Sequence, residues 1–156
     1  MERPFSAYKG DEPYIFVSYS HKDARGVFPE LTKLRNQGFN IWYDEGIELG
    51  AEWREEIGAA ILNASVFLYF VSEAAAQSGN CRKEVGMADK QKIPTVAIHL
   101  EETNLPPRLE LTLSDLQAII KYEMPVAEYE NKLYSRIAAF IEQPIAQPTT
   151  MTIKPK

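Results

Sequence analysis

The sequence predicts a single α/β domain with a doubly wound, five-stranded parallel sheet and helices on both faces. Five apolar segments rich in strand-forming residues recur about every 25 residues along the 156-residue chain. Turn-forming residues and an amphipathic helical pattern follow most of these segments, as in consecutive βαβ units. With 45% hydrophobic and 25% charged residues, the chain can form one hydrophobic core and is too short for two large ones.

The predicted strands are segments in which apolar, β-branched and aromatic residues dominate. They cover residues 15–19, 40–43, 65–71 and 94–100, with a weaker candidate at 117–122. The segment 65–71 is apolar on both faces, which is typical of a central strand covered by helices on each side. We therefore expect this segment near the middle of the sheet.

The predicted helices have apolar residues three or four positions apart. They cover residues 27–37, 51–63, 80–91 and 126–141. The first helix is expected to begin at Val27, because Pro29 is tolerated only in a first helical turn, and to end before Gly38. In the second helix, Trp53 and Ile57 begin the apolar stripe that faces the core.

Three segments carry little regular pattern. Residues 101–115, which include two adjacent prolines, predict at most a short helix. Residues 1–12 are expected to be flexible and unanchored, and the domain to span residues 13–142. Residues 143–156 are rich in Pro, Thr, Gln and Lys, so we expect a linker or disordered tail of the kind that leads to a further domain.

The composition argues against several functional classes. The net charge of -5 provides no basic field for a phosphate backbone, so we expect no general nucleic-acid binding. No segment is apolar over the length of a bilayer, and the N-terminus has no apolar signal-peptide region, so we expect no membrane partner. The single Cys81 cannot form an internal disulfide, which fits a reducing, cytoplasmic compartment.

The loops at the carboxyl ends of parallel strands are where ligands bind. Three such loops, at residues 18–23, 44–50 and 72–84, are rich in small polar and acidic residues, whereas the strands before them are apolar. Gly46 and Gly50 in the second loop allow positive φ or a close approach of backbone to a ligand. The sequence therefore predicts one ligand site formed by these loops.

The third loop leads into a helix that begins near Asn80, where Cys81 and Glu84 fall on one face. The residues one helical turn away from Glu84 are Asn80 and Ala88, so no basic residue of the helix is placed to pair with its carboxylate. Glu84 is therefore the candidate reactive group. Cys81 is a candidate ligand contact, although a thiol of this kind is commonly a small buried hydrophobe.

Three motifs occur in order along the chain. They are Ser-Tyr-Ser-His-Lys-Asp at residues 18–23, Trp-Tyr-Asp-Glu-Gly-Ile at residues 42–47, and Cys-x-x-Glu at residues 81–84. Together they resemble Toll/interleukin-1 receptor (TIR) domains of the bacterial, NAD-cleaving type, over roughly residues 13–142. Asn80 stands where the pattern of that family usually has Trp, which removes an aromatic ring from that position.

The resemblance implies a flavodoxin-like fold with strand order 2-1-3-4-5. It implies that Glu84 is the catalytic residue that breaks the nicotinamide–ribose bond of NAD+, with NAD+ as the substrate and no separate cofactor or metal. It also implies activation by self-association, a role in bacterial antiphage defence, and a fused or associated sensor domain. The loop implied to mediate TIR–TIR contact consists of Glu45, Gly46, Ile47, Glu48, Leu49 and Gly50.

The expected substrate contacts lie in the same loops. Ser20, His21 and Lys22, with nearby backbone amides, are expected to bind phosphates, and Trp42 or Tyr43 to cover an aromatic ring of the ligand. The carboxylate of Glu84 would stabilise the positive charge that develops on the ribose as nicotinamide leaves. The remaining candidate contacts also suit capping or turn roles, and they are Asp23, Asp44, Ser72 and Ser78.

Other functions remain open at the level of sequence. The main alternative is a non-catalytic module that acts by TIR–TIR association, but such a module needs no carboxylate at Glu84. A nucleoside deoxyribosyltransferase-like enzyme shares the fold type, but it needs a second acidic nucleophile that we do not identify. A phosphoacceptor receiver domain is disfavoured, because the third strand ends at Ser72 and not at an aspartate.

Overall fold

The computed structural model describes residues 2–45, 51–114 and 116–142. It confirms the predicted fold, since five parallel strands form one sheet in the order β2-β1-β3-β4-β5. The strands are β1 (Ile15–Ser18), β2 (Ile41–Tyr43), β3 (Val66–Val71), β4 (Thr95–His99) and β5 (Gln117–Ile120). Every residue of β3 is buried, so the apolar segment 65–71 supplies the central strand as predicted.

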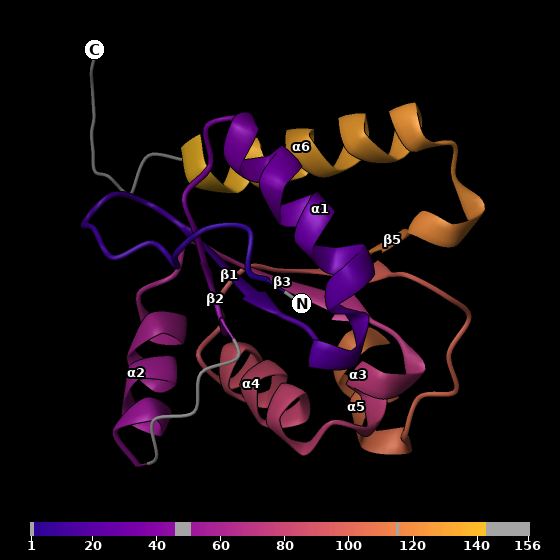
Figure 1. Ribbon diagram of the computed structural model, residues 1–156. Helices are drawn as coiled ribbons and strands as arrows, with labels where there is room; N and C mark the ends of the chain where they lie inside the picture. Colours follow the sequence, from indigo (N-terminus) through magenta and orange to yellow (C-terminus); the bar gives the residue numbers. More distant parts are fainter. Residues whose placement is uncertain (1, 46–50, 115, 143–156) are drawn as a thin grey trace, which may run out of the picture.

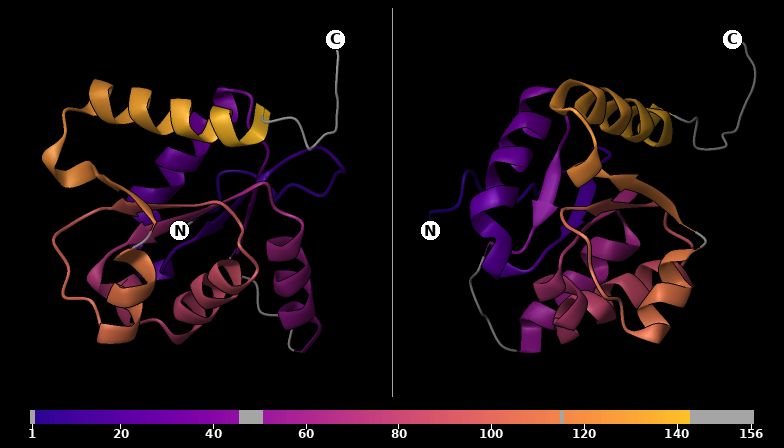
Figure 2. Two further views of the ribbon diagram at one scale, coloured as in Figure 1. Left: turned by 180° about the vertical axis from the view of Figure 1, so that it is seen from behind. Right: turned by 90° about the vertical axis from the view of Figure 1, so that its right-hand side faces the viewer.

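Helices cover both faces of the sheet. They are α1 (Ala24–Asn36), α2 (Ala51–Leu62), α3 (Glu73–Gln77), α4 (Gly79–Lys90), α5 (Pro107–Ser114) and α6 (Val126–Glu142), with 3-10 turns η1 (His21–Asp23) and η2 (Lys121–Glu123). α1 and α6 lie on one face, and α2, α3, α4 and α5 lie on the other (Figure 1). Figure 2 shows the same two layers from behind and from the side.

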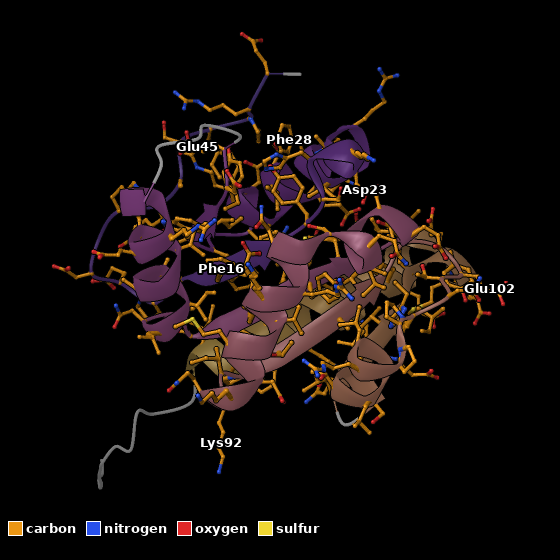
Figure 3. All side chains as sticks on the ribbon, turned by 90° about the horizontal axis from the view of Figure 1, so that it is seen from below. Phe16, Asp23, Phe28, Glu45, Lys92 and Glu102 are labelled. Carbon is orange, nitrogen blue, oxygen red and sulfur yellow. The ribbon has the colours of Figure 1, made fainter. Side chains whose placement is uncertain are left out.

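Aromatic rings pack between the sheet and the α2/α4 layer. Phe16 is in register with Trp42 of β2 and Phe67 of β3, and its ring stacks on both, with ring centroids 4.9 and 5.2 Å apart. Figure 3, which is viewed from the helical layer, shows Phe16 between α2 and α4. Because side chains alternate along a strand, Ser18 at the end of β1 faces the same layer as Phe16.

The start of α1 differs from the sequence-based expectation. The helix begins at Ala24, because η1 leads directly into it, and Pro29 lies inside the helix and not in its first turn. Pro29 has no N–H group to donate to the carbonyl of Arg25, but Arg25 is exposed, so water can hydrate that carbonyl. The end of α1 is as predicted, with Gly38 at a φ of 99°.

Two other helices were not fully predicted. Residues 101–115 contain α5, whose Leu109 and Leu113 are buried against the core. α3 was not predicted at all, because its five residues are too few to show a helical period. Within the described residues, no helix is both long enough and apolar enough to cross a membrane.

The N-terminal segment, residues 2–12, was expected to be unanchored but packs on the outer edge of β2. The Tyr8 N–H donates to the carbonyl of Ile41 at 2.8 Å, and the hydroxyl of Tyr43 donates to the carbonyl of Phe5. These partners are more than 30 positions apart, so local sequence does not reveal the contacts. The predicted tail at residues 143–156 lies outside the described residues.

Replacing Phe5 with Ala is expected to lower the free energy of unfolding by about 1–2 kcal/mol. The Phe5 ring meets Tyr43 edge-on at 5.4 Å and lies 4.8 Å from the guanidinium of Arg35, and the substitution removes both contacts. Urea denaturation measures the change, with Ser6→Ala at the exposed neighbouring position as the control. Equal stability of Phe5→Ala and the wild type would mean that the Phe5 ring contributes nothing to the stability of the fold.

Candidate functional site

A cleft of about 630 Å³ opens at the carboxyl ends of β1 and β3, where η1, α3 and α4 begin. This is the edge at which the loops of a parallel sheet meet and where ligands bind. The cleft lining comes from all three loops that the sequence nominates. The lining residues are Val17, Tyr19, Ser20, His21, Lys22, Asp44, Glu73, Ala74, Gln77, Ser78, Asn80, Cys81 and Glu84.

Glu84 is held in the cleft by contacts from two elements. Ser78 caps α4, since its Oγ accepts a hydrogen bond from the Cys81 N–H at 3.2 Å, and this fixes the end of the helix next to the sheet. From α4, Glu84 reaches β1, where Ser18 Oγ donates a hydrogen bond to Glu84 Oε1 at 2.7 Å. Ser18 is 1% exposed, so the carboxylate meets a polar group at the edge of the core.

The carboxyl group of Glu84 is a weaker acid in this position than an ordinary glutamate. Burial raises its pKa to about 7, and the negative charge of Asp44 acts in the same direction. The hydrogen bond from Ser18 and the nearby His21 oppose this increase. Near neutral pH the protonated and ionised forms are therefore both populated, which is a common property of reactive groups in clefts.

His21 and Asp44 form another part of the cleft lining. His21 Nε2 lies 3.1 Å from Asp44 Oδ2, and the hydroxyl of Tyr19 donates to the Asp44 carbonyl at 2.6 Å. These contacts hold the end of β2 beside the turn that follows β1. Lys22, in the same turn, is exposed, and its backbone N–H donates to Ser20 Oγ at 3.2 Å. The turn thus brings cationic and hydroxyl groups to the cleft.

Cys81 contributes shape to the cleft and not nucleophilic character. Its side chain is 2% exposed, and burial raises the pKa of the thiol to about 11. A hydrogen bond with Ser78 lowers this pKa, whereas the charge of Glu84 raises it. The thiol is therefore protonated at neutral pH, and the thiolate that would act as a nucleophile is scarce.

The structure brings most of the predicted ligand contacts together. The predicted residues that line the cleft are Ser20, His21, Lys22, Asp44, Ser78, Cys81 and Glu84. Trp42 and Tyr43, expected to cover a ligand ring, instead lie in the core at 4% and 0% exposure. Trp42 stacks on Phe16, and Tyr43 packs against Phe28, so neither ring lines the cleft.

Asp23 and Ser72 form a structural pair beside the cleft. Ser72 Oγ donates to Asp23 Oδ2 and accepts from the Ala75 N–H at 3.0 Å, so it caps α3 and ties that helix to the turn after β1. Neither side chain lines the cleft, so the expectation of ligand contact is not supported for this pair. The hydrogen bonds that these two side chains form lie within the fold.

The loop implied to mediate self-association is described only at its first residue. The Glu45 carboxylate accepts hydrogen bonds from the Ala7 N–H at 2.5 Å and from Arg3, so it is engaged within the chain. Gly46, Ile47, Glu48, Leu49 and Gly50 lie outside the described residues.

Ser18 and Tyr19 were not predicted from the sequence as site residues. Ser18 binds Glu84, and Tyr19 binds the Asp44 carbonyl and lines the cleft. A signal for Ser18 was present, since it is a polar residue that continues an otherwise apolar buried strand. Tyr19 gave no such signal, because an aromatic residue at the end of a strand is ordinary core material.

The arrangement suits a polar ligand with an anionic part and a part that becomes positively charged. The carboxylate of Glu84 can stabilise a developing cation, and Lys22 and the hydroxyl of Ser20 can meet an anion. Among the described residues, no group of three or more His, Cys, Asp or Glu side chains is arranged to hold a metal ion. The volume falls within the range of about 300–1,000 Å³ that is usual for small-molecule sites.

Comparisons with known proteins agree with this fold. The family model described as "TIR domain" matches residues 15–137. Among solved structures, the TIR domain of the Toll-related receptor TRR-2 from the lower metazoan Hydra magnipapillata is similar, with a TM-score of 0.64 and 16% sequence identity. The match covers 79% of this chain and 96% of that chain, and at this identity it shows the fold alone. A search of curated proteins gives no match.

Replacing Glu84 with Gln is expected to stabilise the fold at high pH. Because the folded-state pKa of about 7 lies above the ordinary value of 4.5, the contribution of Glu84 to stability is full below pH 4.5 and is lost as pH rises through 7. Gln has no such loss. The advantage of Glu84→Gln in the free energy of unfolding should grow with pH and reach about 3 kcal/mol at about pH 8.

Urea denaturation of the variant and the wild type at each pH measures this difference. Asp89→Asn, on the exposed side of the same helix, is the control for loss of one negative charge. A difference between Glu84→Gln and the wild type that does not change with pH would show that Glu84 is not desolvated in the folded state.

Proposed function

Because this chain belongs to the TIR-domain family, we propose that it is an NAD+ glycohydrolase. It breaks the bond between nicotinamide and ribose, and the product is ADP-ribose or a cyclic isomer of it. The observation that carries the proposal is the Glu84 carboxylate, which is desolvated, lines the cleft and is held by Ser18. We propose further that this activity serves antiphage defence, as the resemblance of its sequence motifs to bacterial NAD-cleaving TIR domains implies.

Cleavage of the nicotinamide–ribose bond requires an ionised carboxylate and not a general acid. When the ribose C1′–nitrogen bond breaks, its electron pair leaves with nicotinamide, which departs as a neutral molecule. The ribose is left with an oxocarbenium-like positive charge, similar to that in glycoside hydrolysis. An ionised Glu84 beside the ribose stabilises this charge, and a water molecule or the adenine of the same substrate then attacks C1′.

The rest of the cleft matches the other parts of NAD+. The pyrophosphate is anionic, and the turn after β1 offers the Lys22 side chain and the Ser20 hydroxyl at the cleft. Asp44 lines the cleft, and its carboxylate lies 3.1 Å from His21 Nε2. With Trp42 and Tyr43 in the core, the ring that covers the base is not supplied by β2.

The alternative for this family is a non-catalytic module that acts by TIR–TIR association. Two features favour the enzyme over this module. A desolvated carboxylate costs folding free energy, and a scaffold gains nothing from it. In addition, the Ser18 hydroxyl donates its hydrogen bond to this carboxylate, which fixes the orientation of Glu84 in the cleft.

Glu84→Gln and Glu84→Ala are each expected to lower the rate of NAD+ cleavage by a factor of about 10² to 10³. Gln keeps the size and the hydrogen bond to Ser18 but cannot carry the charge that stabilises the ribose cation. The measurement incubates the pure protein with NAD+ and separates nicotinamide, ADP-ribose and cyclic products by chromatography.

Asp89→Asn is the matched control on the same helix, because its side chain is exposed and does not line the cleft. It should cleave NAD+ at the wild-type rate. Near wild-type cleavage by Glu84→Gln would remove Glu84 from the mechanism, and a folded, assembled wild type without any cleavage would favour the association module.

NAD+ cleavage per molecule is expected to increase with protein concentration. Asp44 lines the cleft, and residues 45–50 follow it directly in the sequence. The family resemblance assigns self-association to the same loop. Specific activity measured over a hundredfold dilution series, with the oligomeric state followed by light scattering, tests the expectation. Constant specific activity from a protein that stays monomeric would contradict it.

A further inference from the structure

Tyr69 lies in β3 below the cleft, and its hydroxyl is buried without a partner. The side chain is fully buried, and Tyr69 Oη is the one buried side-chain nitrogen or oxygen in the described part of the chain without a hydrogen bond. The hydroxyl groups of the other buried tyrosines are used, as in the bond from Tyr129 to Glu30 at 2.7 Å. A phenylalanine would fill the same space without this cost, so the hydroxyl needs an explanation.

The position of Tyr69 in the sheet directs it toward Glu84. Tyr69 is in register with Ser18 on the neighbouring strand, so the two side chains lie on the same face. Ser18 binds Glu84 of α4 on that face. The charged and titratable groups near the Tyr69 hydroxyl are Cys81, Glu84 and Arg82 of α4, and Asp23 of η1.

We propose that Tyr69 is a positioning residue whose hydroxyl donates a hydrogen bond to Glu84 when that carboxylate is ionised. This proposal rests on the function proposed for Glu84. An ionised carboxylate has about four acceptor sites. Ser18 fills one of them, and the Cys81 thiol is a weak donor. Among the described residues, Tyr69 is the remaining strong donor buried on this face, and Glu84 is one of its electrostatic neighbours. The proposal requires the Glu84 side chain to turn toward Tyr69 when it ionises.

The surroundings keep Tyr69 in the donor form. Burial raises the pKa of its hydroxyl, and the neighbouring Cys81 and Glu84 raise it further, so the group stays protonated at every pH at which the protein functions. For Glu84, the neighbours that influence its ionisation are Ser18, Asp44 and His21. A further donor to the ionised form would lower the pKa of Glu84, and loss of that donor would raise it.

Tyr69→Phe tests the proposal, because it removes only the oxygen atom. In a protein labelled with ¹³C at the glutamate carboxyl groups, the resonance of Glu84 is assigned by its loss in Glu84→Gln and is then titrated. Tyr69→Phe should raise the pKa of Glu84, and the acidic limb of the pH profile of NAD+ cleavage should move upward by about one pH unit. At about pH 5, where Glu84 is protonated, the melting temperature should stay the same or rise, because Tyr69 Oη has no hydrogen bond to lose in that form.

Tyr129→Phe is the matched control, since Tyr129 is equally buried but binds Glu30 on the α1/α6 side. It should lower the melting temperature and leave the titration of Glu84 unchanged. An unchanged titration of Glu84 in Tyr69→Phe overturns the proposal. If wild-type protein cleaves no NAD+, the titration still decides the role of Tyr69, so its failure and the failure of the proposed function are distinguishable.

A second measurement covers the case in which Tyr69→Phe does not fold. The ¹³Cζ resonance of Tyr69 in the wild type should shift as Glu84 ionises, because its hydroxyl becomes a donor to the carboxylate. The same resonance in Glu84→Gln should show no such shift. A Tyr69 resonance that is equally insensitive to pH in both proteins would also overturn the proposal.

Discussion

The hydrogen bond between Ser18 and Glu84 is the contact on which the site depends. It joins the end of β1 to α4 across the boundary between core and cleft. Because β1 is paired with strands on both sides, the Ser18 hydroxyl has a fixed position, and the flexible glutamate side chain takes its position from it. The hydrogen bond holds the Glu84 carboxylate in a low-dielectric environment, and the raised pKa of Glu84 follows from that position.

The rest of the fold offsets the free-energy cost of this placement. A desolvated acid, an unpartnered tyrosine hydroxyl and a buried thiol gather within one region of α4 and β3. The desolvated acid and the unpartnered hydroxyl are each unfavourable relative to an apolar residue of the same size. The stacked rings around Phe16 and the fully buried β3 lie next to this region and hold it rigid. The stable centre of the sheet thus offsets the free-energy cost of the unfavourable polar groups at its edge.

Much of the fold was predictable, because strand and helix periods are local properties of the sequence. The order of loops around the cleft followed from the rule for parallel sheets, and this placed Glu84 and the turn of residues 20–22 correctly. The failures have other causes. Both faces of β2 are covered, so its sequence shows no alternation of apolar and polar residues. Without that alternation, the sequence did not indicate that Trp42 faces the core and not a ligand. The contacts of Phe5 and Ser18 are formed with residues distant in sequence, which no local pattern encodes.

The docking of Tyr8 on Ile41 makes the two margins of the sheet unequal. A bare outer strand is a template on which another chain can add a strand by main-chain pairing. At β2 the molecule already occupies part of that template with its own N-terminal residues. At β5, no described segment is bonded to the outer margin. A strand from another molecule is therefore favoured to pair with the outer margin of β5 and not with that of β2.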